Sequence, residues 1–554
     1  MEEANERIQK QYDALLKKYD DLSHRVESGS RVRPRNSAAS TTRMASRVGA
    51  VEYQEPPSQE ARGGQGAQGT GGRTNPERFN EGGLGAEGME RPPFTAPGGL
   101  PAPAPTGGGL EGAQAGLSRR VELGFGAQGT AGRVYPPESA IEGEERVPRR
   151  IAKVEFAEGL ELSSPDDEFK LTFHNLTQAE FRGFPTNQQG ILQSQFFIPR
   201  QRWYFTGRVT RNIEYYTVIN RGYGALDLLD AFVTYRIDER FRLRAGRMKT
   251  PYLYEYYSIA EGDLIAPERS LYADNMAANR QMGMMALGEL LEGRLGYALG
   301  VFNGPRRSFQ DFNSAKDVIG YFNTRPFLKS ETYKVLNYLN VGGSWDVGYQ
   351  NNPTQPNALR TANDQTPNLA VVSLSPTWLT FNDNVVEQGE RIQWAGHLIW
   401  YYKSLTLLAE YGGGVAGYAF NTSKTSSYIP YDGYMVQATY FLTGEHLTRR
   451  VNVVKPKSDF SWVKGKRGPG AIEVHGRFST LNFGKQVFTD GFADPNLWSN
   501  RAWATDIGLN WYLNFYTKVM LDWQHSDFYT PVIVGPDHFG VNRDLFWLRF
   551  QVFF

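Results

Sequence analysis

From about residue 151 onward, apolar and polar side chains alternate in short stretches, which is the periodicity of β-strands. In residues 231–238 one face is apolar and is formed by Ala231, Val233, Tyr235 and Ile237. The other face carries Thr234, Arg236 and Asp238 together with Phe232. After a tight turn, residues 241–245 continue the alternation around Arg242 and Arg244. The pattern predicts a sheet with an apolar medium on one side and water on the other.

Sixteen such stretches follow one another, separated by Gly, Asn, Asp and Pro. They are centred near residues 176, 202, 215, 232, 245, 286, 297, 321, 342, 396, 410, 437, 475, 508, 521 and 549. Tight connections lie near 238–240, 290–293, 403–404 and 513–516, and long ones at 250–280, 303–316, 351–389, 416–430, 483–501 and 528–542. Short turns at one end and long loops at the other predict an all-β, sixteen-stranded antiparallel transmembrane barrel. The segment 444–466 is an exception, because it is a long connection at the end where the others are tight turns.

The chain ends with LFWLRFQVFF, an ending that a soluble protein would expose to water at a cost. One face of this last stretch is apolar and is expected to meet lipid; its residues are Phe546, Leu548, Phe550, Val552 and Phe554. Arg549 and Gln551 share the other face, which would line a wet lumen. Pairing with the first strand would satisfy the backbone and leave no open edge. A strand of a soluble sandwich remains the alternative.

Two segments precede the barrel, which we assign to residues 151–554. Residues 1–28 predict a coiled-coil helix that ends at Gly29, with a seam formed by Ile8, Tyr12, Leu15, Tyr19, Leu22 and Val26. An amphipathic helix lying on its own domain is the alternative. Residues 29–150 form a low-complexity Gly/Pro-rich linker that we expect to be disordered. Within it GAQGTGGR at 66–73 recurs as GAQGTAGR at 126–133, either as a docking repeat or as compositional drift.

Composition narrows the class of protein. Lys and Arg number 60 against 59 Asp and Glu, so the basic field of a nucleic-acid-binding protein is absent. There is no cysteine, which excludes disulfides and zinc–thiolate sites. No apolar run reaches roughly 18 residues, which excludes a transmembrane helix. Aromatic residues make up 13% and would fit the girdles of a barrel, although a sugar-binding sandwich could share that excess. The polar start MEEANERIQK is not a secretory signal, so an export signal would lie outside this numbering.

Catalytic motifs do not appear in the sequence. Its seven histidines include no metal-spaced pair, and we find no Gly-x-Ser-x-Gly elbow, phosphate loop or dinucleotide fingerprint. We therefore expect no enzymatic activity, no cofactor and no metal site.

A set of ordered motifs resembles the phosphate-selective porins O and P of Gram-negative outer membranes. They are DAFVTYRIDERFRLRAGRMKTPY, ERSL, LGYALGVFNG, GYMVQATYFLTGEH, GAIEVHGRFSTLNF and TDIGLNWYLNFYTKVMLDW. The terminal Phe554 also resembles the signal that directs barrel assembly. The resemblance covers about 165–554 and implies a trimeric sixteen-stranded barrel. It also implies that the third loop, here about 250–280, folds inward and that basic residues line the constriction.

Individual positions depart from the family's pattern. The family's arginine pair falls on Arg200 and Gln201, with Arg202 on the same strand face as Arg200. A lumen lysine falls on Arg244, the constriction lysine on Tyr256 and its partner aspartate on Leu229. The arginine-dense fifth loop keeps Arg360 alone, so phosphate specificity does not follow from the resemblance. Our pore-lining candidates are Arg200, Arg202, Arg242, Arg244, Lys249, Glu268 and Arg269. The alternative for each is a structural ion pair or an exposed loop charge.

The sequence thus predicts a bacterial outer-membrane porin, a passive diffusion channel for small hydrophilic or anionic solutes. Expected partners are outer-membrane lipid and two further copies of the chain. The alternative is a structural envelope protein, whose coiled coil would reach a periplasmic or cell-wall partner through the linker. A soluble β-rich binding protein is a third reading.

Overall fold

The computed structural model describes residues 153–156, 159–188, 192–223, 225–307, 309–363, 374–423, 425–450, 454–535 and 538–554. The predicted coiled coil of residues 1–28, with its seam from Ile8 to Val26, lies outside the described residues, as does the predicted linker of 29–150. No helix among the described residues is long and apolar enough to cross a membrane.

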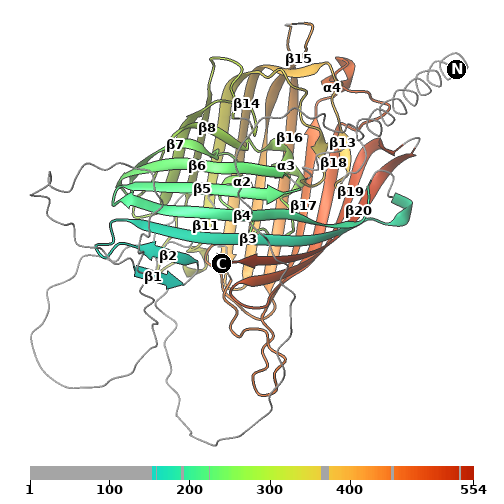
Figure 1. Ribbon diagram of the computed structural model, residues 1–554. Coiled ribbons are helices and arrows are strands. Elements are labelled where there is room, and N and C mark those ends of the chain that lie inside the picture. The colour runs from blue at the N-terminus through green and yellow to red at the C-terminus, as the bar shows by residue number, and fades with distance from the viewer. Residues whose placement is uncertain are drawn as a thin grey trace, which may run out of the picture. The chain divides into compact units, whose positions relative to one another are not determined.

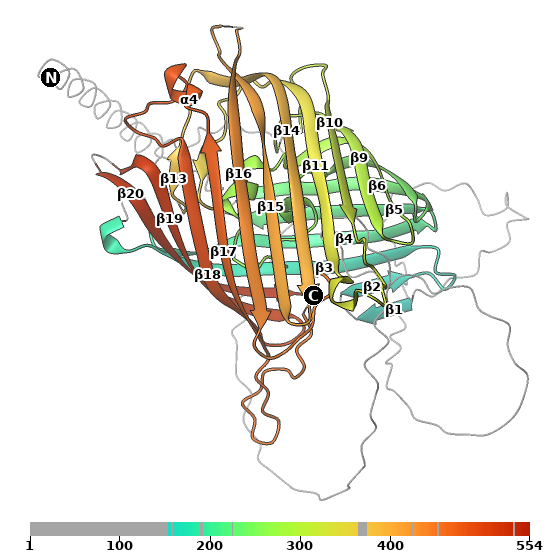
Figure 2. The same cartoon turned by 180° about the vertical axis from the view of Figure 1, so that it is seen from behind.

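Sixteen antiparallel strands form a closed barrel within the described part of the chain, as predicted (Figures 1 and 2). They are β3 (Lys170–Gly183), β4 (Gln195–Thr210), β5 (Ile213–Gly222), β6 (Ala225–Asp238), β7 (Phe241–Lys249), β8 (Arg280–Leu290), β9 (Leu295–Phe302), β10 (Asp317–Thr324), β11 (Leu339–Asn351), β14 (Val385–Tyr402), β15 (Leu405–Phe420), β16 (Ser427–Phe441), β17 (Ala471–Phe483), β18 (Arg501–Tyr512), β19 (Thr517–Gly535) and β20 (His538–Phe553). The barrel closes where β20 pairs with β3, from Phe546 opposite Gly183 to Phe553 opposite Leu176. Closure removes the sheet edges that lipid could not satisfy.

A short hairpin precedes the barrel and was not predicted from the sequence. Strands β1 (Lys153–Phe156) and β2 (Leu160–Ser163) pair with each other. β2 also pairs with β3, from Leu160 opposite Phe173 to Ser163 opposite Lys170. The hairpin therefore pairs with the first residues of β3, which β20 does not reach.

The alternation of the last strand is confirmed by its exposure. Phe546 and Phe550 are 48% and 50% exposed on the outer surface of the barrel, whereas Arg549 is 0% and Gln551 3% exposed on the inner side. Phe554 adds the final backbone bonds of the seam. Its N–H donates to the carbonyl of Asn175 (3.1 Å) and its carbonyl accepts from the Asn175 N–H (2.8 Å). The outer face is apolar because hydrocarbon solvates it.

Two predicted long loops are wrong. Residues 528–542 were expected to form a loop, but β19 runs to Gly535 and β20 begins at His538. Residues 416–430 are also mostly strand, because β15 ends at Phe420 and β16 begins at Ser427. The sequence predicted loops there because the strict apolar–polar alternation stops before the strands end. Pro531 and Gly535 are also residue types that are common in turns. The backbone pairs there regardless, because two neighbouring antiparallel strands hold each other in register.

The third loop folds into the barrel, as the resemblance implied. This inward loop, residues 250–279, contains α2 (Tyr254–Tyr257) and α3 (Leu271–Met276). All of its residues except Ser258, Asp274 and Asn279 are buried. The fifth loop, 352–384, also sends a small hairpin inward, formed by β12 (Leu359–Arg360) and β13 (Thr377–Leu379). The two loops meet inside the barrel, where Asn275 of the third loop is hydrogen-bonded to the backbone of Arg360 in the fifth.

Short helices lie in the connections between barrel strands. They are η2 (Thr186–Gln188), η3 (Lys334–Leu336) and α4 (Gln486–Thr489).

Candidate functional site

All seven pore-lining candidates lie inside the barrel, and all are buried by the walls and the inward loop. Arg200 and Arg202 come from β4, Arg242 and Arg244 from β7, Lys249 from the end of β7, and Glu268 and Arg269 from the inward loop. The strand positions follow from their parity, because every second side chain of a barrel strand points inward. The structure brings four of the seven together around two carboxylates of the inward loop, one of which is the fifth candidate, Glu268.

Glu268 is the first of these carboxylates. Arg200 donates to both of its oxygens, at 2.9 Å and 2.5 Å. Arg549 of β20 donates at 2.6 Å, and Arg182 of β3 lies at 3.6 Å. Arg182 and Arg549 also pair with Glu180, the former at 2.6 Å. Three guanidinium groups, from β3, β4 and β20, therefore hold the inward loop against the place where the barrel closes.

Glu261 is the second carboxylate. Arg202 approaches one of its oxygens at 2.9 Å and Lys249 the same oxygen at 3.3 Å. Arg269, from the loop itself, donates to the other oxygen at 3.0 Å, and Arg280 of β8 lies at 3.6 Å from it. A carboxylate that is buried among several charge-assisted bonds is held in one position. Arg200, Arg202, Lys249 and Arg269 thus each have a carboxylate partner, and their role in lining the pore stays a prediction.

Two further carboxylates fix the ends of the loop helices. Glu255 of α2 binds Arg477 of β17 at 3.1 Å and accepts from the Ser270 N–H at 3.1 Å. Glu410 of β15 accepts the N–H groups of Tyr254 (2.5 Å) and Glu255 (3.2 Å). These N–H groups open a helix and lack partners within it. A wall side chain thereby satisfies backbone groups of the buried loop.

Arg242 and Arg244 lie nearer the end of the barrel that carries the tight turns. Arg244 donates from Nε to the hydroxyl of Thr234 at 2.9 Å, and its guanidinium stands 4.3 Å from the centre of the Phe232 ring. The hydrogen bond and the ring contact together hold Arg244 against the inner wall of the barrel.

The positions where the chain departs from the family have distinct surroundings. Tyr256 is a buried residue of α2, with the Arg269 guanidinium 4.8 Å and the Lys249 ammonium 5.5 Å from its ring centre. Gln201 donates to Asn175 at 2.6 Å, on the face of β4 opposite to Arg200. Leu229 is a partly buried residue that packs against the hydrophobic core. Tyr256 thus lies between two cations but adds no positive charge of its own.

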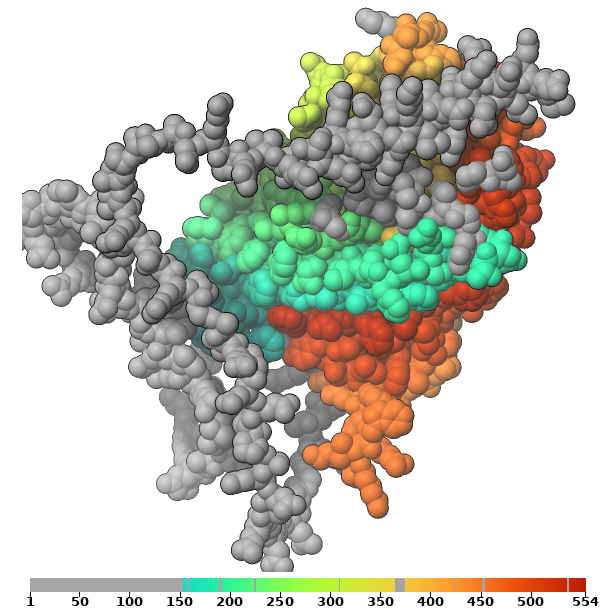
Figure 3. All heavy atoms as spheres, turned by 45° about the vertical axis from the view of Figure 1, so that its right-hand side comes forward, coloured from blue at the N-terminus to red at the C-terminus, as the bar shows by residue number. Residues whose placement is uncertain are grey.

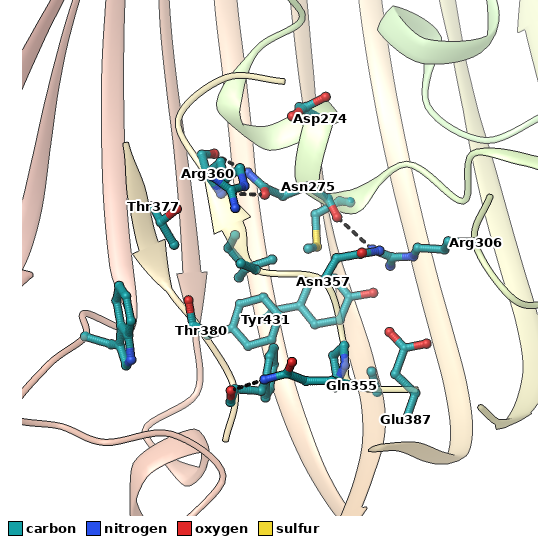
Figure 4. Close-up of a pocket in the computed structure, with 18 of the residues that line it drawn as sticks. Asp274, Asn275, Arg306, Gln355, Asn357, Arg360, Thr377, Thr380, Glu387 and Tyr431 are labelled. Carbon is teal, nitrogen blue, oxygen red and sulfur yellow. Dashed lines mark hydrogen bonds between the residues drawn. The ribbon is translucent and has the colours of Figure 1, made fainter. Parts of the chain in front are cut away.

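A cavity of about 490 Å³ lies on the long-loop side of the inward loop (Figure 4). Its wall combines α3, the fourth and fifth loops and the ends of β14 to β17. Arg306 donates to the Asn275 carbonyl at 2.7 Å, and Asn275 exchanges hydrogen bonds with the backbone of Arg360 at 2.7 Å and 3.0 Å. Partial burial among the loop and wall residues raises the pKa of the Asp274 carboxyl to about 6, against the opposing effect of Arg307. We name this cavity, which is lined by both polar and apolar residues, the vestibule.

Sequence reasoning missed most of the partners in the network: Arg182, Arg280, Arg477, Glu180, Glu255, Glu261 and Glu410. Arg549 had been placed on the lumen face by parity, and Arg477 lies within a motif that carried the family resemblance. Parity could have shown that the wall residues face inward. It could not show which loop carboxylate each one meets, because those contacts join residues far apart in the chain.

A closed sixteen-stranded barrel with an inward third loop is the architecture of a general porin. A sequence model described as phosphate-selective porin O and P matches residues 169–530. The chain therefore belongs to this family of outer-membrane porins.

Several solved structures align with the chain at low sequence identity and modest TM-scores. OmpT of Vibrio cholerae has a TM-score of 0.41 and 8% identity, covering 73% of this chain and 100% of its own. An anion-selective porin from Comamonas acidovorans has a TM-score of 0.41 and 11% identity, covering 70% and 100%. OmpF of Salmonella typhi has a TM-score of 0.42 and 13% identity, covering 73% and 100%. A search of curated proteins found no match.

Proposed function

We propose that the protein is a passive diffusion channel of the bacterial outer membrane that admits small hydrophilic solutes and prefers anions. The charge balance of the network around the inward loop carries this proposal. Its eight basic members are Arg182, Arg200, Arg202, Lys249, Arg269, Arg280, Arg477 and Arg549, and its seven acidic members are Glu180, Asp230, Glu255, Glu261, Glu268, Glu410 and Asp506. Cations outnumber carboxylates in this set, and an excess of fixed positive charge in a narrow low-dielectric passage raises the local concentration of anions.

The preference is proposed for small anions in general and not for phosphate. Most cations at the constriction already have a carboxylate partner, so few donors are left to replace the hydration shell of a phosphate. Tyr256, where the family has a lysine, adds none. Arg244 and Arg242 extend the positive wall toward the tight-turn end of the barrel.

We also propose that the channel is a homotrimer whose predicted N-terminal coiled coil supports self-association. A periplasmic or cell-wall partner of that helix would make the chain an envelope tether as well. The two roles are compatible, because the tether would lie outside the barrel.

Swelling of proteoliposomes tests the proposed function. The vesicles are loaded with an impermeant polymer and placed in isosmotic solutions of neutral sugars of increasing size, or of the sodium salts of organic acids of matched size. We expect the smallest solutes to enter, and anions to enter faster than neutral solutes of equal size. Arg244→Gln should narrow that difference, whereas Arg240→Gln, on an exposed turn, should not. Equal rates for anions and neutral solutes would remove the anion preference and keep the channel.

A further inference from the structure

The connection between β16 and β17 is unlike the other turns at its end of the barrel. β16 ends at Phe441 and β17 begins at Ala471, whereas the neighbouring β14–β15 connection is a two-residue turn at 403–404. Figures 1 and 3 show this connection, in orange, projecting beyond the ends of the strands. Its outer half, residues 460–469, contributes nothing to the lumen network, and we name it the basic hairpin.

The basic hairpin is an ordered structure with a fixed root. Its two arms are joined by hydrogen bonds between Ser461 and Gly468, at 3.0 Å and 3.3 Å. Gly465 supplies the positive φ of 86° that its tight tip requires. At the root, the Phe460 N–H donates to the Leu513 carbonyl at 2.6 Å. The hairpin therefore holds its tip residues in a defined place relative to the barrel.

The root of the hairpin joins the lipid-facing surface. Phe460 packs edge-on against Trp511 of β18, with ring centres 4.6 Å apart, and the Trp511 indole donates to the Pro469 carbonyl at 2.7 Å. Trp511 faces outward, because its neighbours Asn510 and Tyr512 are buried in the lumen. It is thus part of the outer aromatic surface at the tight-turn end. Phe460 and the hairpin extend this surface beyond the barrel.

The tip combines exposed apolar groups with basic ones. Trp462 is 80% and Val463 63% exposed, and Lys464, Lys466 and Arg467 beside them are exposed too. Between 455 and 467 the sequence has five basic residues and one acidic residue, Asp459. The Trp462 ring touches the Phe460 ring, with centres 5.1 Å apart, and its exposed remainder would be favoured among lipid headgroups over water. Long basic side chains beside it can reach the phosphates there.

We propose that the basic hairpin is a membrane anchor outside the barrel. Trp462 and Val463 enter the headgroup region of the leaflet that borders the tight-turn end, and Lys464, Lys466 and Arg467 bind lipid phosphates. The lipid bilayer is the favoured occupant because the hairpin root continues the lipid-facing surface without a break. A soluble polyanion would be met by the cations alone and would leave the indole and the valine in water.

The absence of cysteine from the chain allows a direct test. Val463→Cys in the full chain gives a single thiol, which is labelled with a polarity-sensitive nitrobenzoxadiazole fluorophore. The protein is then reconstituted in vesicles of phosphatidylcholine, with or without phosphatidylglycerol. We expect blue-shifted emission that spin-labelled lipid quenches more strongly than aqueous iodide does. Anionic lipid should strengthen both effects.

Matched variants isolate the basic residues. Lys464→Gln, Lys466→Gln and Arg467→Gln, combined in the labelled protein, should make the label accessible to iodide and insensitive to anionic lipid. The combination Arg240→Gln, Lys329→Gln and Lys334→Gln removes the same charge from other connections at this end of the barrel and should leave the label in lipid. Heat-modifiable migration on gels shows that every variant carries a folded barrel. A label open to iodide in all vesicles would overturn the proposal. So would a blue shift that appears only when purified cell-wall fragments are added, since the occupant would then be that polymer.

Discussion

Among individual residues, the carboxylates of the inward loop determine how the lumen is held. Burial by itself would raise the pKa of the Glu268 carboxyl, but Arg200 and Arg549 hold that pKa well below its ordinary value. A carboxyl with a depressed folded-state pKa adds stability above its unfolded pKa and loses that contribution only as the pH falls toward the folded value. Glu268 therefore stays charged across neutral and mildly acidic pH, and the loop stays anchored.

Glu268→Gln should weaken this anchor and alter selectivity. Arg182, Arg200 and Arg549 would keep their charges but lose their shared partner, and breaking a buried ion pair typically costs about 3–5 kcal/mol. We expect a corresponding fall in the free energy of unfolding, measured by urea titration in detergent. The removed negative charge should move the reversal potential further toward that of chloride. Glu331→Gln is the control, because this side chain is 88% exposed and its pair with Lys334 contributes little. Equal stability of the two variants would contradict the anchoring role.

Asp274 provides a pH dependence in the vestibule. Because partial burial raises its pKa to about 6, the group is mostly charged at pH 8 and mostly neutral at pH 5. Lowering the pH across this range should remove one negative charge from the wall of the cavity and increase the anion preference. Asp274→Asn should show the higher preference at both pH values. A wild-type reversal potential that is constant between pH 8 and pH 5 would refute this prediction.

Among the strands, the seam between β20 and β3 completes the barrel. Phe554 hydrogen-bonds to Asn175, and its ring lies 6.3 Å from that of Phe156 in β1 and 6.4 Å from that of Phe173 in β3. The terminal residue thus joins three strands at the end of the chain. Its contacts can form only when the last strand meets the first, so they belong to a late step of folding.

Phe554→Ala should slow closure more than it destabilises the closed barrel. The backbone bonds to Asn175 can form without the ring, whereas the aromatic contacts that guide the two ends together are lost. Refolding in detergent is followed by heat-modifiable migration on gels. Phe539→Ala, which truncates a 45% exposed ring at the other end of the same strand, is the control and should refold like the wild type. Equal refolding rates for both variants would assign Phe554 no part in closure.

The strands and loops show which parts of the structure a single sequence can predict. Strand period located all sixteen barrel strands, because each must present an apolar face to lipid over its full crossing. The period failed at 528–542, where the strands extend past the alternating region. It also missed β1 and β2, each of four residues, which are too short to show a pattern. Parity placed Arg242 and Arg244 inside the barrel correctly. The pairing of Arg202 and Lys249 with Glu261 required the path of the inward loop, which no local pattern contains.

In the molecule as a whole, we expect the channel and the predicted N-terminal segment to act independently. The lumen network is formed entirely by residues from Glu180 onward. Deleting residues 1–150 should therefore leave single-channel conductance unchanged, while any envelope attachment through the coiled coil would be lost. Conductance is measured in planar bilayers, and attachment by the sensitivity of cells to detergent. Loss of conductance on truncation would make the segment part of the channel.

Single-channel recording of the full chain in a planar bilayer under a KCl gradient is the decisive test of the anion-preferring channel. The excess of cations at the constriction predicts stepwise conductance, small because two loops narrow the lumen, with a reversal potential on the chloride side. Heat-modifiable barrels that give no conductance, or a reversal potential on the potassium side, would contradict the proposed function.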